Sequence, residues 1–316
     1  VNKWNTTLKL KWNPVNVKNF IKKEFSYYVN LYIKLLEETS KDNSAISEFL
    51  LYNSLNDQDR QYLLILSACS LNEIQENEKI KIVSKLFDKY FTLLNLNGCY
   101  DSNNFTESVI SLNVAIRNKS IEEINDLFNN QLLMDISSKK AKQTDTPFIL
   151  AYFKDAGYTT LQRRFLRYLF ARVEYFISKE CNMPAENYNN LVLNTGPKNG
   201  YHIEHNLAHN KENLELFDNN EELFERERNR LGGLVLLKGK DNLSSGSERY
   251  VDKLKTYAGT NVWNQTLLED FYHKKKDFED FNKRFKLNFK PIPNLNKDMI
   301  EERSNIMFNL VKIIWD

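Results

Sequence analysis

The sequence predicts a mainly α-helical protein with a small loop-and-strand module embedded between its helices. Along most of the chain, apolar residues recur at spacings of three and four, which is typical of amphipathic helices. Glycine, which long helices avoid, is scarce, and six of the nine glycines fall between residues 196 and 246. Two short runs within this stretch, at 201–205 and 234–237, are expected to form β-strands.

The helical pattern divides the chain into two predicted domains. Amphipathic segments in the first part span residues 15–39, 57–71 and 79–94. Ser120 and Glu123 also have the spacing of a capping box, in which each side chain bonds the other's backbone N–H at a helix start. We therefore expect a helical domain at 1–144 and a second domain at 145–316, whose core module covers 201–257.

The core module of the second domain is expected to be flanked by helices. The clearest helical pattern begins at Thr159, and others cover residues 266–284 and 298–315. Residues 183–200 are expected to be a linker, because Met183-Pro184 begins it and Gly200 ends it.

The composition favours a globular protein of a reducing compartment. The chain of 316 residues is 41% hydrophobic and 27% charged, and its net charge of +2 means that any basic surface must be local. Three widely spaced cysteines argue against a disulfide framework, so a cytoplasmic location is expected. No apolar run approaches the ~18 residues of a membrane span, and no membrane association is expected.

Candidate catalytic residues gather at the first predicted strand. His202 and Glu204 lie on one face of such a strand and His205 on the other, so the strand must end near His205 for all three to serve one centre. The zinc motif H-E-x-x-H is absent. The carboxylate of Glu204 and the amide oxygen of Asn242 suit Mg²⁺ or Mn²⁺, and His205 could accept a proton from water near neutral pH.

Together these features have the layout of an HNH (ββα-metal) nuclease site. A Glu-His pair ends the first strand, a loop and a second strand follow, and Asn242 begins the next helix. The chemistry that this layout indicates is hydrolysis of a phosphodiester bond with one divalent cation.

Three stretches resemble the C-terminal HNH-nuclease domain of the GmrSD-type modification-dependent (type IV) restriction enzymes. They read Y-H-I-E-H, E-R-N-R-L-G-G-L-V-L-L-K-G-K-D-N and S-S-G-S-E-R-Y-V-D-K-L-K-T-Y, at residues 201–205, 227–242 and 244–257. The helix L-R-Y-L-F-A-R-V-E-Y-F and the closing I-I-W also look like this family. The resemblance covers residues 145–316 well and residues 1–144 less specifically.

The resemblance implies roles for particular residues. His205 would be the general base, Glu204 the adjacent acid and metal ligand, and Asn242 the residue that completes the metal site. Lys253, on the same helix as Asn242, would lie near the substrate backbone. Many members carry Asn where this chain has Gly233, and Asn229 is the nearest replacement.

Two assignments stay open in the sequence. The alternative role of Asn229 is that of a helix C-cap. His202 is included in the site as a supporting residue. The phosphate contacts that we expect are basic residues surrounding the module, and each lysine among them could equally be solvated: Arg230, Lys238, Lys240, Lys253 and Lys255.

We therefore expect a Mg²⁺- or Mn²⁺-dependent endonuclease that cleaves foreign, modified or phage DNA. The alternatives are a catalytically weakened DNA-binding or sensor subunit of a defence system, which the glycine at 233 favours, and an HNH nuclease that acts on RNA. The resemblance also implies an N-terminal half with a D-G-Q-Q-R motif that this sequence lacks. An N-terminal half or partner subunit outside this chain is accordingly expected, and nucleotide binding by this chain is not.

Overall fold

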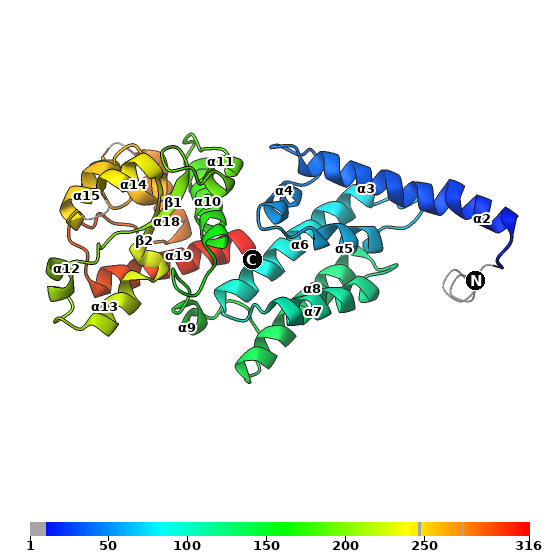
Figure 1. Ribbon diagram of the computed structural model, residues 1–316, viewed down its shortest axis with the longest axis horizontal. Helices are drawn as coiled ribbons and strands as arrows, with labels where there is room; N and C mark the ends of the chain where they lie inside the picture. Colours follow the sequence, from blue (N-terminus) through cyan, green and yellow to red (C-terminus); the bar gives the residue numbers. More distant parts are fainter. Residues whose placement is uncertain (1–10, 246–247, 274) are drawn as a thin grey trace. The chain divides into compact units, whose positions relative to one another are not determined.

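The structure, a computed structural model, describes residues 11–245, 248–273 and 275–316. It divides into two compact units, residues 1–91 with 100–138, and residues 92–99 with 139–316. Residues 1–10 of the expected helical domain, and Gly246 and Ser247 of the third family-like stretch, lie outside the described residues. The described part is mainly helical with two short strands, as predicted (Figure 1).

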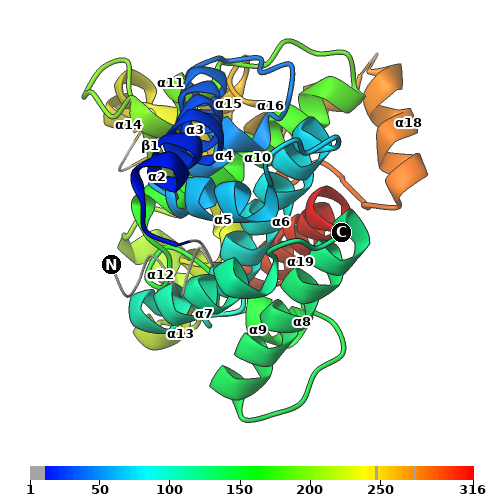
Figure 2. The same cartoon turned by 90° about the vertical axis from the view of Figure 1, so that its right-hand side faces the viewer.

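The first unit is built from helices. They are α2 (Pro14–Phe20), the π-helix η1 (Ile21–Phe25), α3 (Ser26–Thr39), α4 (Phe49–Ser54), α5 (Arg60–Ala68), most of α6 (Glu76–Leu96), α7 (Ser102–Ala115) and α8 (Ile121–Lys140). Helices α7 and α8 lie side by side, and Ser108 of α7 donates to Asp135 of α8 at 3.3 Å (Figures 1 and 2). The capping box is confirmed, because Ser120 Oγ accepts from Glu123 N–H at 3.2 Å and Glu123 Oε2 from Ser120 N–H at 2.9 Å.

The second unit surrounds a two-stranded sheet with helices. Before and between the strands lie α9 (Leu150–Phe153), α10 (Arg163–Glu180), α11 (Tyr188–Leu193), α12 (Lys211–Glu215), α13 (Glu221–Arg228) and the short 3₁₀ turn η2 (Leu231–Gly233). After them come α14 (Gly239–Ser245), α15 (Tyr250–Tyr257), α16 (Val262–Gln265), α17 (Glu269–Tyr272), α18 (Lys276–Phe285) and α19 (Lys297–Trp315).

Two expectations for this unit need correction. The expected linker at 183–200 contains α11, whose start is capped by the Asn187 side chain accepting from the N–H of Asn189 at 2.7 Å. The single helix expected at 266–284 is instead α17 and α18, because the chain turns extended at His273. Phe271 and Phe278 pack across this break with ring centroids 4.8 Å apart, so their helical spacing reflects shared burial.

The sheet is an antiparallel hairpin of β1 (Tyr201–His205) and β2 (Leu234–Lys238). Its register places Glu204 opposite Val235 and His205 opposite Leu234. Four of the five residues of β2 are buried, as expected for a strand in a protein core. Helix α16 covers this strand, because Trp263 Nε1 donates to the Leu234 carbonyl at 3.1 Å and Asn264 Nδ2 to that of Leu236 at 2.9 Å.

Buried charged groups on α10 and α19 fix the position of α16. The Glu174 carboxylate accepts from the N–H groups of Val262 at 2.7 Å and Trp263 at 3.1 Å, and burial raises the pKa of Glu174 to about 7. The Arg303 guanidinium lies 4.1 Å from the Trp263 ring and donates to the Gly232 carbonyl at 3.3 Å. The hairpin therefore sits on a rigid support, which a precisely held site requires.

Within the described ranges, no helix combines the length and the apolar character that crossing a membrane would need.

Candidate active site

The predicted catalytic residues lie along the hairpin and near both of its ends, because the register pairs His205 with the start of β2, after Asn229, and Tyr201 with the end of β2, ahead of Asn242. His202, Glu204 and His205 are all in β1, which ends at His205 as expected. Asn229 is at the end of α13, on the approach to β2. Asn242 is half-buried in α14, which packs against both strands.

A hydrogen-bond chain orients the imidazole of His205. Its Nε2 lies 2.8 Å from Asn229 Oδ1. The Asn229 amide nitrogen donates to the Glu225 carbonyl at 2.6 Å and to Glu225 Oε2 at 3.1 Å, so its Oδ1 must be the acceptor toward the histidine. Neutral His205 therefore carries its proton on Nε2, and Nδ1 keeps a lone pair that can accept a proton.

Aromatic packing and burial keep His205 neutral. The ring of Tyr158 packs edge-on against the imidazole, with the two ring centroids 4.4 Å apart. The Arg163 guanidinium lies 3.3 Å from the centroid of the Tyr158 ring. Burial, followed by the nearby charge of Arg228, lowers the pKa of His205 to about 4. The value near 6.5 of an unperturbed histidine therefore does not apply, and His205 is deprotonated across the neutral pH range.

Lys253 anchors the end of β1 from α15. Its Nζ donates to Glu204 Oε1 at 2.6 Å and to the carbonyl of His205 at 2.8 Å. The lysine side chain is fully buried, whereas that of Glu204 retains 14% exposure. This placement corrects two expectations: Lys253 lies on a different helix from Asn242, and its ammonium is enclosed by protein where no DNA phosphate reaches it.

The structure explains the glycine at position 233. A Cβ on Gly233 would lie 2.6 Å from the Arg228 carbonyl oxygen, which is closer than real contacts allow. No asparagine fits there without a shift of the backbone. Asn229 is the C-cap residue of α13, and its side chain also holds His205.

The chemistry of Glu204 and Asn242 fits a hard divalent cation. Lys253 occupies one oxygen of Glu204, and Oε2 makes no hydrogen bond with any residue that the structure describes. A carboxylate oxygen and an amide oxygen are ligands that Mg²⁺ and Mn²⁺ accept. Among the described residues, one group has three metal-ligand atoms within 4.8 Å of one another. It consists of the exposed His209 and Glu221 and the half-buried Glu225, and exposed acidic groups are common without an ion.

The other predicted residues have diverse surroundings. His202 is half-buried, and its Nε2 lies 3.4 Å from the Gly196 carbonyl oxygen. Lys238 Nζ is 3.7 Å from Glu186, Lys255 is exposed and 3.3 Å from Asp252, and Lys240 is exposed. Arg230 is 8% exposed and pairs with Glu227.

Three residues that shape the site were missed in the sequence. Glu225 holds Asn229, and its position four residues earlier on one helix was a signal that could have found it. Arg228 influences His205 through charge and sits one residue from Asn229. Tyr158 comes from a segment far away in the sequence, and no local pattern links it to His205.

The comparison with known families identifies this region. Residues 143–310, just over half of the chain, match the family described as GmrSD restriction endonucleases, C-terminal domain. The chain belongs to this family. No curated protein and no solved structure gave a match in the corresponding comparisons.

Membership of the GmrSD C-terminal family confirms the resemblance seen in the motifs. It makes the second unit a nuclease domain of restriction-endonuclease type, with DNA as the implied substrate. The matched range includes the hairpin, Tyr158, Asn229, Asn242 and Lys253, so every part of the site described above lies within the family's own domain.

Proposed function

We propose that this protein is an HNH endonuclease that hydrolyses DNA phosphodiester bonds with Mg²⁺ or Mn²⁺ and restricts foreign, modified DNA. The observation that carries the proposal is the chain from Glu225 through Asn229 to His205. It supports a histidine that is neutral, oriented and free to accept a proton at Nδ1. Family membership supports the nuclease class, and the residues of the site support the HNH type.

The residues divide the reaction between them. His205 Nδ1 takes a proton from the attacking water while Asn229 keeps the imidazole in one tautomer and one orientation. Glu204, fixed by Lys253, and Asn242 would hold the divalent cation. The cation, when bound, stabilises charge on the scissile phosphate and on the leaving oxygen.

The weakened-sensor alternative loses its main support in this geometry. It rested on the missing asparagine at 233, and Asn229 supplies a side-chain amide to His205 from the preceding turn. The geometry does not separate DNA from RNA as the substrate, because a phosphate held by a cation looks alike in both nucleic acids. We favour DNA on the family's description as restriction endonucleases.

The decisive experiment is a plasmid-nicking assay with Mg²⁺ or Mn²⁺. The wild-type protein should nick supercoiled DNA, and His205→Ala should not, because a general base contributes ~10²–10⁴-fold in rate. His273→Ala is the matched control, since His273 is an exposed histidine on another part of the domain. Equal activity of His205→Ala and wild type would contradict the assigned mechanism.

The preference for modified DNA and for DNA over RNA needs separate experiments. The same plasmid prepared with and without modified bases should show faster cleavage of the modified form. Addition of structured RNA as a competitor should leave plasmid cleavage unchanged. Preferential degradation of the RNA would assign the enzyme to RNA instead of DNA.

A further inference from the structure

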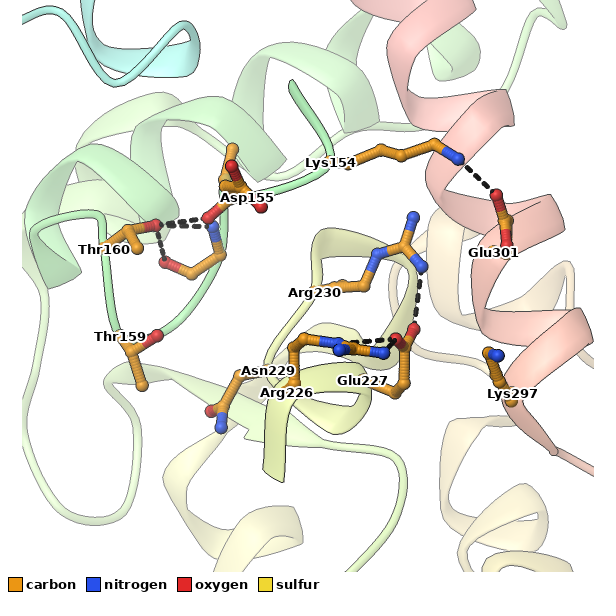
Figure 3. Close-up of a pocket in the computed structure, with 12 residues that line it drawn as sticks. Lys154, Asp155, Thr159, Thr160, Arg226, Glu227, Asn229, Arg230, Lys297 and Glu301 are labelled. Carbon is orange, nitrogen blue, oxygen red and sulfur yellow. Dashed lines mark hydrogen bonds and ion pairs between the residues drawn. The ribbon is translucent and has the colours of Figure 1, made fainter. Parts of the chain in front are cut away.

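A cavity of about 610 Å³ opens beside the candidate active site, on the far side of Asn229. Figure 3 shows Arg230 in its middle, with Lys154 and Glu301 on one side and Glu227 on the other. Its walls come from the segment that precedes α10, from the end of α13 and from the first turns of α19. A volume of this size lies within the range of small-ligand sites in proteins.

Arg230 lines this cavity, and one edge of its guanidinium makes no hydrogen bond with any residue that the structure describes. Its Nη1 donates to Glu227 Oε2 at 2.7 Å, but Nε and Nη2 are buried and have no hydrogen-bond partner within the described ranges. The residue is only 8% exposed. Buried donors of a charged group are costly to leave unpaired, so an acceptor with two oxygens is expected at this edge.

The unused edge has the geometry that phosphate prefers. Nε and Nη2 lie on the same side of the planar guanidinium, and their N–H groups form a parallel fork. Such a fork binds two oxygens of a phosphate or a carboxylate at once, which a lysine ammonium cannot do.

The charges around the fork favour an anion. The carboxylates of Glu227 and Glu301 are already engaged, Glu227 with Arg226 as well as Arg230, and Glu301 with Lys154 at 2.6 Å. Lys297 is exposed and has no ion-pair partner among the described residues. The exposed carboxylate of Asp155 also lines the cavity, and it has no ion pair with any residue in the described part of the chain.

A helix start adds to this preference. Lys297 is the first residue of the nineteen-residue helix α19, so the positive end of the helix dipole faces the same space as the fork.

Backbone contacts connect the wall of the cavity to the residues around His205. Gly157 and Arg230 form an antiparallel bridge, and the N–H of Tyr158 donates to the Asn229 carbonyl at 2.8 Å. The two residues next to this bridge, Tyr158 and Asn229, both have side chains that contact the His205 ring. The cavity wall is therefore continuous with the residues that hold the His205 ring.

We propose that the Arg230 cavity is a phosphate-binding subsite, in which the Arg230 fork and Lys297 hold a backbone phosphate of the DNA strand bound at His205. The DNA assignment rests on the proposed function, and the phosphate chemistry rests on the cavity itself. Free phosphate or a nucleotide shares this chemistry, so the test separates these sources.

The first arm measures DNA affinity over a salt series, in chelator so that cleavage is not needed. Lys297→Gln should weaken binding several-fold and reduce the slope of log K against log salt by about 0.9, the value for one lost phosphate contact. Lys312→Gln is the matched control, because Lys312 is an exposed lysine about 22 Å further along the same helix. It should leave the slope unchanged.

The second arm measures thermal stabilisation by inorganic phosphate. Phosphate should raise the unfolding midpoint of the wild type and of Lys312→Gln, and raise it less in Lys297→Gln and Arg230→Lys. Arg230→Lys keeps a positive charge but removes the fork, and the unliganded midpoint shows whether that variant is folded.

The outcomes are distinct. An unchanged salt slope in Lys297→Gln, with phosphate still stabilising the wild type, overturns DNA as the source. No stabilisation by phosphate together with an unchanged slope overturns the subsite altogether. Salt-dependent DNA binding that responds to Lys297→Gln, in a protein that never nicks DNA, supports the subsite and refutes the proposed function instead.

Discussion

The lowered pKa of His205 makes a sharp prediction for the pH dependence of cleavage. A general base works only when deprotonated, so the rate should rise with pH through the pKa of His205, which burial lowers to about 4. With that value, the deprotonated fraction should change by only about 1.1-fold between pH 5 and pH 7. A histidine with an unperturbed pKa of ~6.5 would instead give a change of roughly 25-fold.

Asn229→Asp should move the acid side of the pH–rate profile, where the rate rises with pH, into the measured range. The carboxylate would face the Nε2–H of His205 from the position of Asn229 Oδ1, 2.8 Å away, and stabilise the protonated ring. An adjacent opposite charge shifts a pKa by about 1–3 units, so the midpoint should rise from about 4 to roughly 5–7.

The assay is the initial rate of plasmid nicking from pH 4.5 to pH 8, at a divalent-cation concentration that saturates the enzyme at each pH. Wild type should be nearly flat above pH 5, and Asn229→Asp should show a clear acid limb. A wild-type midpoint near pH 6.5 would refute the claim that burial keeps His205 neutral. Identical profiles for both proteins would refute the role of Asn229 as its partner.

Four further predictions follow from the site. His202→Ala should retain nicking at a reduced rate, since His202 supports the strand and does not transfer the proton; loss as complete as in His205→Ala would mean that the base is His202. Asn242→Ala should lose cleavage with an unchanged circular dichroism spectrum, and full activity would leave Asn242 without a catalytic role. Lys253→Met should lower the free energy of unfolding by about 3–5 kcal/mol in a denaturant titration, because Glu204 loses its buried partner, and a change under 1 kcal/mol would contradict that pairing. Because the folded pKa of His205 lies below its unfolded value, the unfolded state binds more protons at acid pH. The free energy of unfolding should therefore fall by up to roughly 3 kcal/mol as the pH drops from ~6.5 to about 4. His205→Gln should lack this contribution to the pH dependence.

Sequence patterns predicted the fold well where local rules decide the structure. The helical periodicity, the glycine-rich window and the two strand-like runs all correspond to observed elements, and the helix at α19 starts within a residue of its expected position. The pattern failed at 266–284, because residues that share burial keep helical spacing even when the chain turns between α17 and α18. It also missed α11, whose start depends on one asparagine cap.

The site was predictable only in its local parts. The Glu204-His205 pair and the approach to β2 were recognisable because they are contiguous in sequence. Lys253 looked like a surface lysine, since nothing in its own helix reveals that a carboxylate and a strand carbonyl meet it in the core. The pKa of His205 likewise depends on a ring from another segment, which no spacing rule reports.

The bridge between Gly157 and Arg230 bears on how such a nuclease can be moved between proteins. A Cβ on Gly157 would lie 2.0 Å from the Asn229 carbonyl oxygen, so the two backbones are in direct contact there. An excised cassette of residues 201–257 would keep His205, Asn229 and Asn242 but lose Tyr158, and with it one wall around the histidine. The segment that can be transplanted is therefore longer and begins ahead of Gly157. Grafts or fusions that begin between Gly157 and β1 should be inactive, although every residue of the motif is present.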